Sequence, residues 1–86
     1  MQINPYKGKS EEDILAEAQK VFDDPLRSKE DRFRELMLIC KYSRDPKNRK
    51  EISVMAHKNA SCPEEAIPAL KIQMNPEFTE PANIVQ

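Results

Sequence analysis

The sequence is poor in glycine, cysteine, histidine and tryptophan. Its 86 residues include one glycine, two cysteines, one histidine and no tryptophan. A glycine-rich loop that cradles phosphate needs several glycines, so this chain cannot build one. A structural zinc site usually takes four Cys or His ligands, and only three such residues are present. We therefore expect no cofactor and no metal.

Long apolar runs are also missing. No segment approaches the roughly 18 apolar residues of a membrane-spanning helix, and no apolar signal segment follows Met1. These absences lead us to expect a cytoplasmic protein without membrane association. In that compartment two cysteines usually stay reduced, and a disulfide between them is the open alternative.

What the chain does contain is a series of amphipathic segments with helix start and stop signals. Lys, Glu, Leu and Ala are plentiful, which favours helix over strand. Ser10, Ser28 and Asp45 each precede a helical pattern and are good N-cap residues. We expect helices over about 10–22, 28–43 and 46–58, and a fourth that starts at Ser61-Cys62-Pro63.

This pattern predicts one all-α domain, either a small bundle or a two-unit helical repeat of four to five helices with flexible termini. We place the helical domain at residues 10–74. Residues 1–9, with Asn4-Pro5 and Gly8, are predicted to be a flexible N-terminal arm. Residues 75–86 are predicted to be a disordered or loosely docked tail.

The segment 28–43 is predicted to be the central helix. Its apolar residues at the spacing i, i+3, i+4, i+7 are Phe33, Leu36, Met37 and Cys40. Leu38, Ile39 and Tyr42 extend the apolar surface around most of the helix. Because a helix that is apolar nearly all round is usually buried between neighbours, we expect this one to form the core.

The fourth helix carries an internal proline. We expect its inward-facing residues to be Ala66, Ile67, Leu70 and Ile72. Pro68 removes a helical hydrogen bond and clashes with the carbonyl four residues earlier. Either the helix is kinked there, or two short helices meet at that point.

A shift of 34 residues aligns the second and fourth helices. Ser28 then matches Cys62, Phe33 matches Ile67, and Leu36 matches Leu70. A period of this length is typical of helical arrays. The competing interpretation is that any two capped amphipathic helix pairs align this well.

Residues 44–70 resemble the leucine-rich-repeat-variant and HEAT-like helical repeats. The residues that carry this resemblance are Asp45-Pro46, Met55-Ala56, Asn59, Cys62-Pro63, Glu65, Ile67 and Leu70. The resemblance implies a two-layer helical packing and an interaction role. It implies no activity.

Charge is distributed unevenly along the chain, although the net charge is only −1. Residues 11–31 hold eight acidic and three basic residues, whereas 32–58 hold three acidic and eight basic ones. Such a split can provide internal complementarity or present a surface of two signs to a partner. Solvated faces of packed helices are the simpler interpretation.

Positive charge is densest where the second and third helices meet. We call this set of residues the basic elbow: Lys41, Arg44, Lys47, Arg49 and Lys50. A loop there frees side chains from core packing, so we predict that these five bind a partner. Our prediction is a small non-catalytic adaptor or regulatory module for protein–protein interaction, with an acidic protein surface as its target. The alternative is a nucleic-acid-binding accessory protein, against which the isoelectric point near 5.8 argues.

Catalysis would have to use Cys62. A thiol at a helix N-terminus is activated by the helix dipole, and His57 is close in sequence. However, Glu64 and Glu65 oppose a thiolate, and serine or aspartate takes the same position before the other helices. Cys62 is therefore interpreted as a cap, and we expect no catalytic residue and no enzyme activity.

Overall fold

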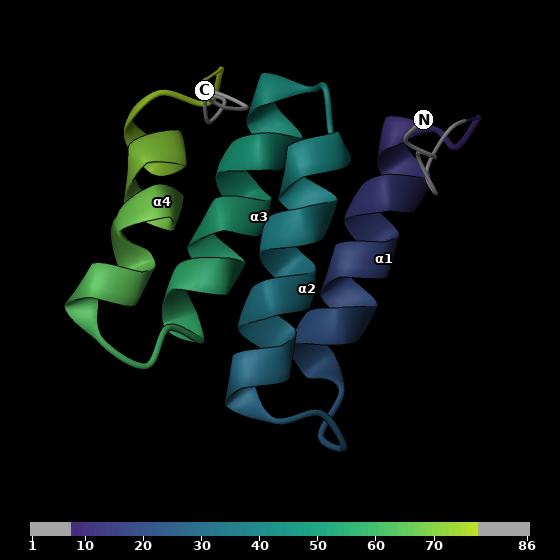
Figure 1. Cartoon of the computed structure of the whole chain (residues 1–86). Helices are drawn as coiled ribbons and strands as arrows, with labels where there is room; N and C mark the ends of the chain where they lie inside the picture. Colours follow the sequence, from purple (N-terminus) through teal and green to yellow (C-terminus); the bar gives the residue numbers. More distant parts are fainter. Residues whose placement is uncertain (1–7, 78–86) are drawn as a thin grey trace, which may run out of the picture.

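A computed structural model describes residues 8–77 of the chain, and within this range the chain forms four α-helices and no strand (Figure 1). The helices are α1 (Glu11–Asp23), α2 (Lys29–Tyr42), α3 (Pro46–Lys58) and α4 (Pro63–Met74). The predicted all-α class is confirmed, and the expected helix positions agree with these bounds to within about a turn. Most of the predicted arm and tail lies outside the described residues.

Local signals determine where the helices begin. The hydroxyls of Ser10 and Ser28 accept hydrogen bonds from the backbone N–H three residues later, each at 3.1 Å. Asp45 caps α3 by accepting from the Lys47 N–H at 3.2 Å. Cys62 occupies the N-cap position of α4, as predicted, but its side chain makes no capping hydrogen bond. These caps act within one turn, which is why the sequence alone predicts them.

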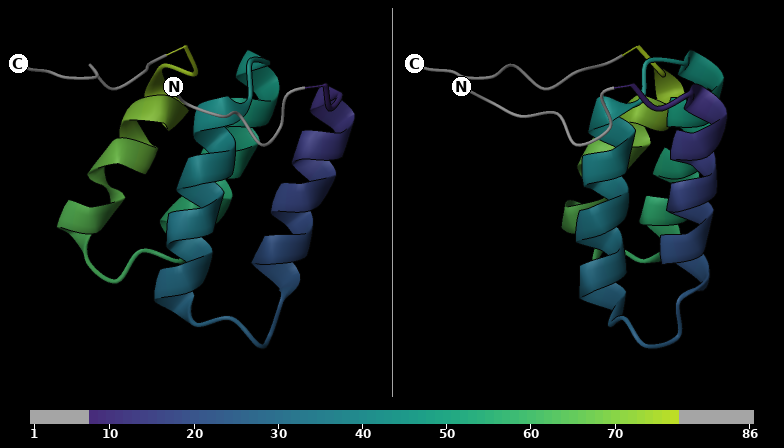
Figure 2. Two further views of the ribbon diagram at one scale, coloured as in Figure 1. Left: turned by 45° about the vertical axis from the view of Figure 1, so that its right-hand side comes forward. Right: turned by 90° about the vertical axis from the view of Figure 1, so that its right-hand side faces the viewer.

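The four helices are arranged in two layers. In the right-hand view of Figure 2, α2 and α4 lie on one side, and α1 and α3 on the other. α2 lies between α1 and α3, as expected, but α3 packs against all three of the other helices. The central helix of the bundle is therefore α3 as much as α2. Among the described helices, none is long and apolar enough to cross a bilayer.

The core is built from small and medium apolar side chains. Its buried members are Ile14, Ala18, Val21, Leu36, Ile39, Cys40, Ile52, Ala56, Ala66, Ala69 and Ile72. Leu36 is fully buried, as predicted, whereas Phe33 and Met37 are partly buried and pack against the core. Leu38 is exposed, so α2 is not buried on all sides.

The inward face of α4 differs from the one predicted. Ala66, Ala69 and Ile72 are buried, whereas Ile67 and Leu70 are exposed. The alanines allow α4 to approach α3 closely, where Ser53 and Ala56 are also small and buried. The predicted burial of Ile67 and Leu70 is therefore wrong.

Pro68 lies inside one continuous helix. The alternative of two short helices meeting at this residue is therefore wrong. The carbonyl that Pro68 leaves without its helical donor belongs to Glu64, an exposed residue in the first turn. Water can bond this carbonyl, which lowers the cost of the proline.

Arg32 fixes the lower end of the bundle in Figure 1. Its Nε donates to the Asn59 side chain at 3.0 Å, which joins α2 to the end of α3. Its Nη1 donates to the carbonyls of Asp24 and Arg27 at 3.0 and 2.6 Å. One guanidinium therefore holds the α1–α2 loop and the α3 C-terminus together.

Candidate functional site

The basic elbow lies at the opposite end of the bundle, where Ser43, Arg44 and Asp45 connect α2 to α3. Four of its members, Lys41, Arg44, Lys47 and Lys50, are exposed. We call these four the elbow cations. Among the described residues, Arg27 and Arg34 form ion pairs with Asp24 and Asp31, and none of the elbow cations does. Four predicted site residues are therefore exposed in or near the α2–α3 connection.

Arg49, the fifth predicted site residue, is buried, with 6% of its surface exposed. Its Nε donates to the Pro76 carbonyl at 2.7 Å, and its Nη1 donates to the carbonyls of Cys40 and Ser43 at 3.3 Å each. The expectation of a solvated partner-binding head is wrong for this residue. Arg49 instead ties α3 to the end of α2 and to the segment after α4.

The same region holds a buried thiol. Cys40 is fully buried, and its Sγ donates to the Arg49 carbonyl at 3.4 Å. Burial raises the pKa of Cys40 to about 11, which the positive charge of Arg49 only partly opposes. Cys40 and Cys62 are free thiols. Cys40 therefore stays protonated and packs as a small apolar residue.

Glu11 holds the elbow against the N-terminus of α1. Its carboxylate accepts from the Ser43 hydroxyl at 2.6 Å, the Arg44 N–H at 3.0 Å and the Asn48 amide at 3.3 Å. The Asn48 amide also donates to the Glu11 carbonyl at 3.0 Å. Partial burial raises the pKa of Glu11, but these hydrogen bonds lower it more, and the net pKa lies below the ordinary value.

These contacts tie the elbow backbone to α1 and α3. The acidic and basic halves of the chain meet at Glu11, yet the bonds use a hydroxyl, an amide and a backbone N–H. The charged side chains of the elbow cations take no part in these hydrogen bonds. The elbow can therefore present positive charge from a fixed backbone, which favours electrostatic attraction of an acidic surface.

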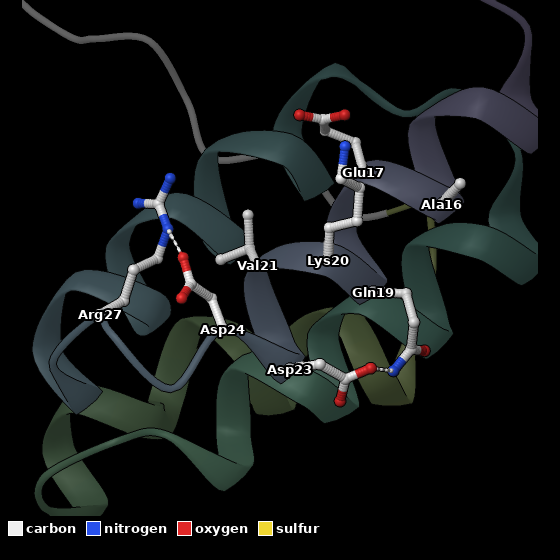
Figure 3. A pocket seen from close by; sticks show the side chains of 8 residues that line it. All are labelled: Ala16, Glu17, Gln19, Lys20, Val21, Asp23, Asp24 and Arg27. Atoms are coloured by element: carbon white, nitrogen blue, oxygen red, sulfur yellow. Dashed lines mark hydrogen bonds and ion pairs between the residues drawn. The ribbon is translucent and has the colours of Figure 1, made fainter.

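A second candidate is a depression of about 630 Å³ on the outer side of α1. Its lining residues are Ala16, Glu17, Gln19, Lys20, Val21, Asp23, Asp24 and Arg27. Figure 3 shows that their polar ends point in different directions instead of into one cavity. Gln19 bonds Asp23 at 2.9 Å, and Arg27 pairs with Asp24 at 3.4 Å. Binding pockets usually enclose a ligand and aim a few polar groups at it, so this depression is a poor one.

A third surface was missed by the sequence reasoning, which placed two of its residues in the core. Ile67, Leu70 and Met74 lie at the spacing i, i+3, i+7 on α4 and are 46%, 37% and 86% exposed. This spacing puts them on one helix face. We call them the α4 stripe. Their pattern is visible in the sequence, but their exposure depends on which face of α4 meets α3.

His57 contacts α4 through Gln73. The Nδ1 of His57 lies 3.1 Å from the Gln73 amide, and Cys62 is exposed at the start of α4. Within residues 8–77, no three His, Cys, Asp or Glu side chains gather as a potential metal site.

Residues 8–77 thus form a small bundle of four helices with exposed cations near the α2–α3 connection and an exposed apolar stripe on α4. No protein-family model, curated protein or solved structure matches the chain.

Proposed function

We propose that this protein is a small non-catalytic interaction module, an adaptor or regulator, that recognises an acidic surface on a partner protein through the elbow cations. The observation that carries the proposal is the hydrogen-bonded elbow. Arg49 and the carboxylate of Glu11 fix its backbone, while Lys41, Arg44, Lys47 and Lys50 remain exposed. Pre-organised charge accelerates encounter without an ordering cost.

A protein target is preferred over nucleic acid because the positive charge is local. The chain as a whole carries a net charge of −1, and the exposed first turn of α1 has further acidic residues close to the elbow. A phosphate backbone would meet this acidic turn along with the cations, whereas a compact acidic patch would not. We also propose a cytoplasmic location, which the two free thiols support.

The test is a charge reversal at the elbow. The 86-residue chain is used to capture partners from nuclease-treated and untreated lysate of the source cells. Binding of the identified partner is then titrated at low and moderate salt. The variant Lys41→Glu/Arg44→Glu/Lys47→Glu should slow association by about tenfold or more at low salt. The matched control is Lys41→Arg/Arg44→Lys/Lys47→Arg, which keeps every charge.

Two results would contradict the proposal. If capture disappears on nuclease treatment and affinity falls steeply with salt, the target is nucleic acid. If the charge-reversed variant folds and binds the partner at the wild-type rate, the elbow is not the site.

A further inference from the structure

The α4 stripe is an apolar face on a helix that has a free side. Among the described helices, α4 packs extensively only against α3, through Ala66, Ala69 and Ile72. Three large apolar residues aligned on the free side of one short helix are more than the scattered exposure that most surfaces show.

The equivalent face of α2 is covered by a helix. A shift of 34 residues aligns the stripe with Phe33, Leu36 and Cys40. Leu36 and Cys40 are fully buried. α3 lies along this face, because Asn59 at its C-terminal end bonds Arg32 and Arg49 near its start accepts from Cys40. The α4 stripe therefore has the residue pattern of a helix-binding face, and no helix among residues 8–77 covers it.

The rim of the stripe on the α3 side carries one cation, Lys50. His57 of α3 contacts Gln73, which is adjacent to Met74 and one turn beyond Leu70. Lys50 precedes His57 by seven residues, which is two turns, so the two lie on the same side of α3. The other flank of the stripe carries Glu64 and Lys71, one charge of each sign, and so favours neither an acidic nor a basic partner. Lys50 is also an elbow cation, which makes the rim continuous with the elbow.

We infer that the α4 stripe binds an amphipathic helix of a partner protein, with its acidic flank facing α3, in the way that α3 packs on α2. The preference for an acidic flank rests on the proposed function, since Lys50 serves both surfaces. A second copy of this chain fits less well, because its own stripe has the same cation, Lys50, at its rim and like charges would meet. The burial of three large apolar side chains provides the attraction, and the charged rim sets the orientation.

The inference can be tested with two synthetic helical peptides of about 16 residues. Both carry the same leucine face at the spacing i, i+3, i+4, i+7, and one flank is glutamate in the first peptide and lysine in the second. Each is titrated into the isotopically labelled 86-residue chain at low salt, and backbone amide shifts are followed. We expect the acidic peptide to shift α4 and the neighbourhood of Lys50, and to bind at least about tenfold more tightly than the basic one.

Matched variants locate the site. Ile67→Ser/Met74→Ser removes two exposed members of the stripe and should lower the affinity for the acidic peptide by about tenfold or more. Leu26→Ser is the control, because Leu26 is a fully exposed leucine on the α1–α2 loop. The elbow variant used above leaves the stripe and Lys50 unchanged, so it separates the two proposals.

Each outcome decides between these surfaces. Failure of the acidic peptide to bind, or equal binding by Ile67→Ser/Met74→Ser, overturns the stripe as a helix site and leaves the elbow function standing. Equal binding of both peptides, lost in the stripe variant, overturns the acidic preference. A wild-type chain that sediments as a dimer and becomes monomeric in the stripe variant would assign the stripe to self-association. Amide and methyl contacts between the stripe and residues 78–86 that the acidic peptide does not displace would assign it to the chain's own C-terminus.

Discussion

Arg49 is the residue whose role differs most from what its charge predicts. Its guanidinium bonds three backbone carbonyls, from the end of α2, from Ser43 and from Pro76 beyond α4. Carbonyls at a helix C-terminus lack helical partners and carry partial negative charge, so a buried cation there is satisfied without a carboxylate. One side chain thereby connects three segments of the chain.

Replacement of Arg49 by methionine should destabilise the protein by about 2–4 kcal/mol. The methionine fills similar volume but removes the guanidinium donors from the carbonyls of Ser43 and Pro76 and leaves the Cys40 carbonyl only the Ser43 N–H. Urea unfolding followed by circular dichroism measures the change. Arg44→Met is the matched control, and its exposed side chain predicts a change within about 0.5 kcal/mol. Equal stability of the two variants would mean that Arg49 does not hold the elbow.

Glu11 makes stability depend on pH in a defined direction. The pKa of its carboxyl is lower in the folded protein than its ordinary value, so the ionised form favours folding. This contribution is fully present above the unfolded pKa of about 4.3 and is lost as pH falls through the folded pKa.

We therefore expect Glu11→Gln to lower the melting temperature at about pH 7, with the difference from wild type shrinking on acidification to about pH 3. Thermal melts across this range give the comparison. Glu12→Gln changes an exposed neighbour in the same turn and serves as the control. If Glu11→Gln lowers the melting temperature by the same amount at about pH 3 as at about pH 7, the carboxylate charge is not what binds Ser43 and Arg44.

At the scale of elements, α2 shows how one helix combines core and surface positions. Leu36 is fully buried, while Leu38, two residues later, is exposed. Residues two apart in a helix face away from each other, so the same residue type has opposite surroundings. The pair provides a matched comparison within one element.

Leu36→Ala should cost about 2–5 kcal/mol, a large share of the stability of a domain this small. The loss combines the removed apolar contact with the cavity left behind. Leu38→Ala should change stability by less than about 1 kcal/mol, because its side chain is exposed. Chemical unfolding of both variants tests this. An unchanged free energy of unfolding for Leu36→Ala would mean that α2 does not contribute to the core.

For the whole molecule, packing is distributed unevenly over the four helices. Among the helices of residues 8–77, α3 contacts all the others, α1 and α2 contact each other and α3, and α4 packs extensively on α3 alone. A helix with one packed neighbour loses least when it detaches, so the bundle has a weak edge at α4.

Native-state hydrogen exchange should resolve this edge. The amides of α4 should exchange through an opening of lower free energy than those of α2 and α3, which should exchange only on global unfolding. α1 provides the comparison, since it is also an outer helix in Figure 1 but has two packed neighbours. Protection of α4 equal to that of α2 would mean that the four helices unfold as one unit. Binding of a helix to the α4 stripe should raise α4 protection specifically.

The sequence by itself determined the class of fold and the positions of the helices. Ser10, Ser28 and Asp45 cap them, and the pair Asp24-Pro25 ends α1. Capping and proline effects involve neighbours within one turn, so they can be interpreted without knowledge of the rest of the chain. The clustering of Lys41, Arg44, Lys47 and Lys50 followed in the same way, because these residues flank a single short loop.

Only the tertiary structure decided which faces are covered. Both faces of α4 are apolar, Ala66 and Ala69 on one and the α4 stripe on the other. α3 meets the small face because alanine permits close helix approach, and that choice depends on the small partners it finds on α3. Arg49 was placed in the elbow by its charge, yet it is buried because carbonyls from three separate segments converge on it. Whether a side chain is buried depends on the surface that packs against it, and that surface comes from a distant part of the sequence.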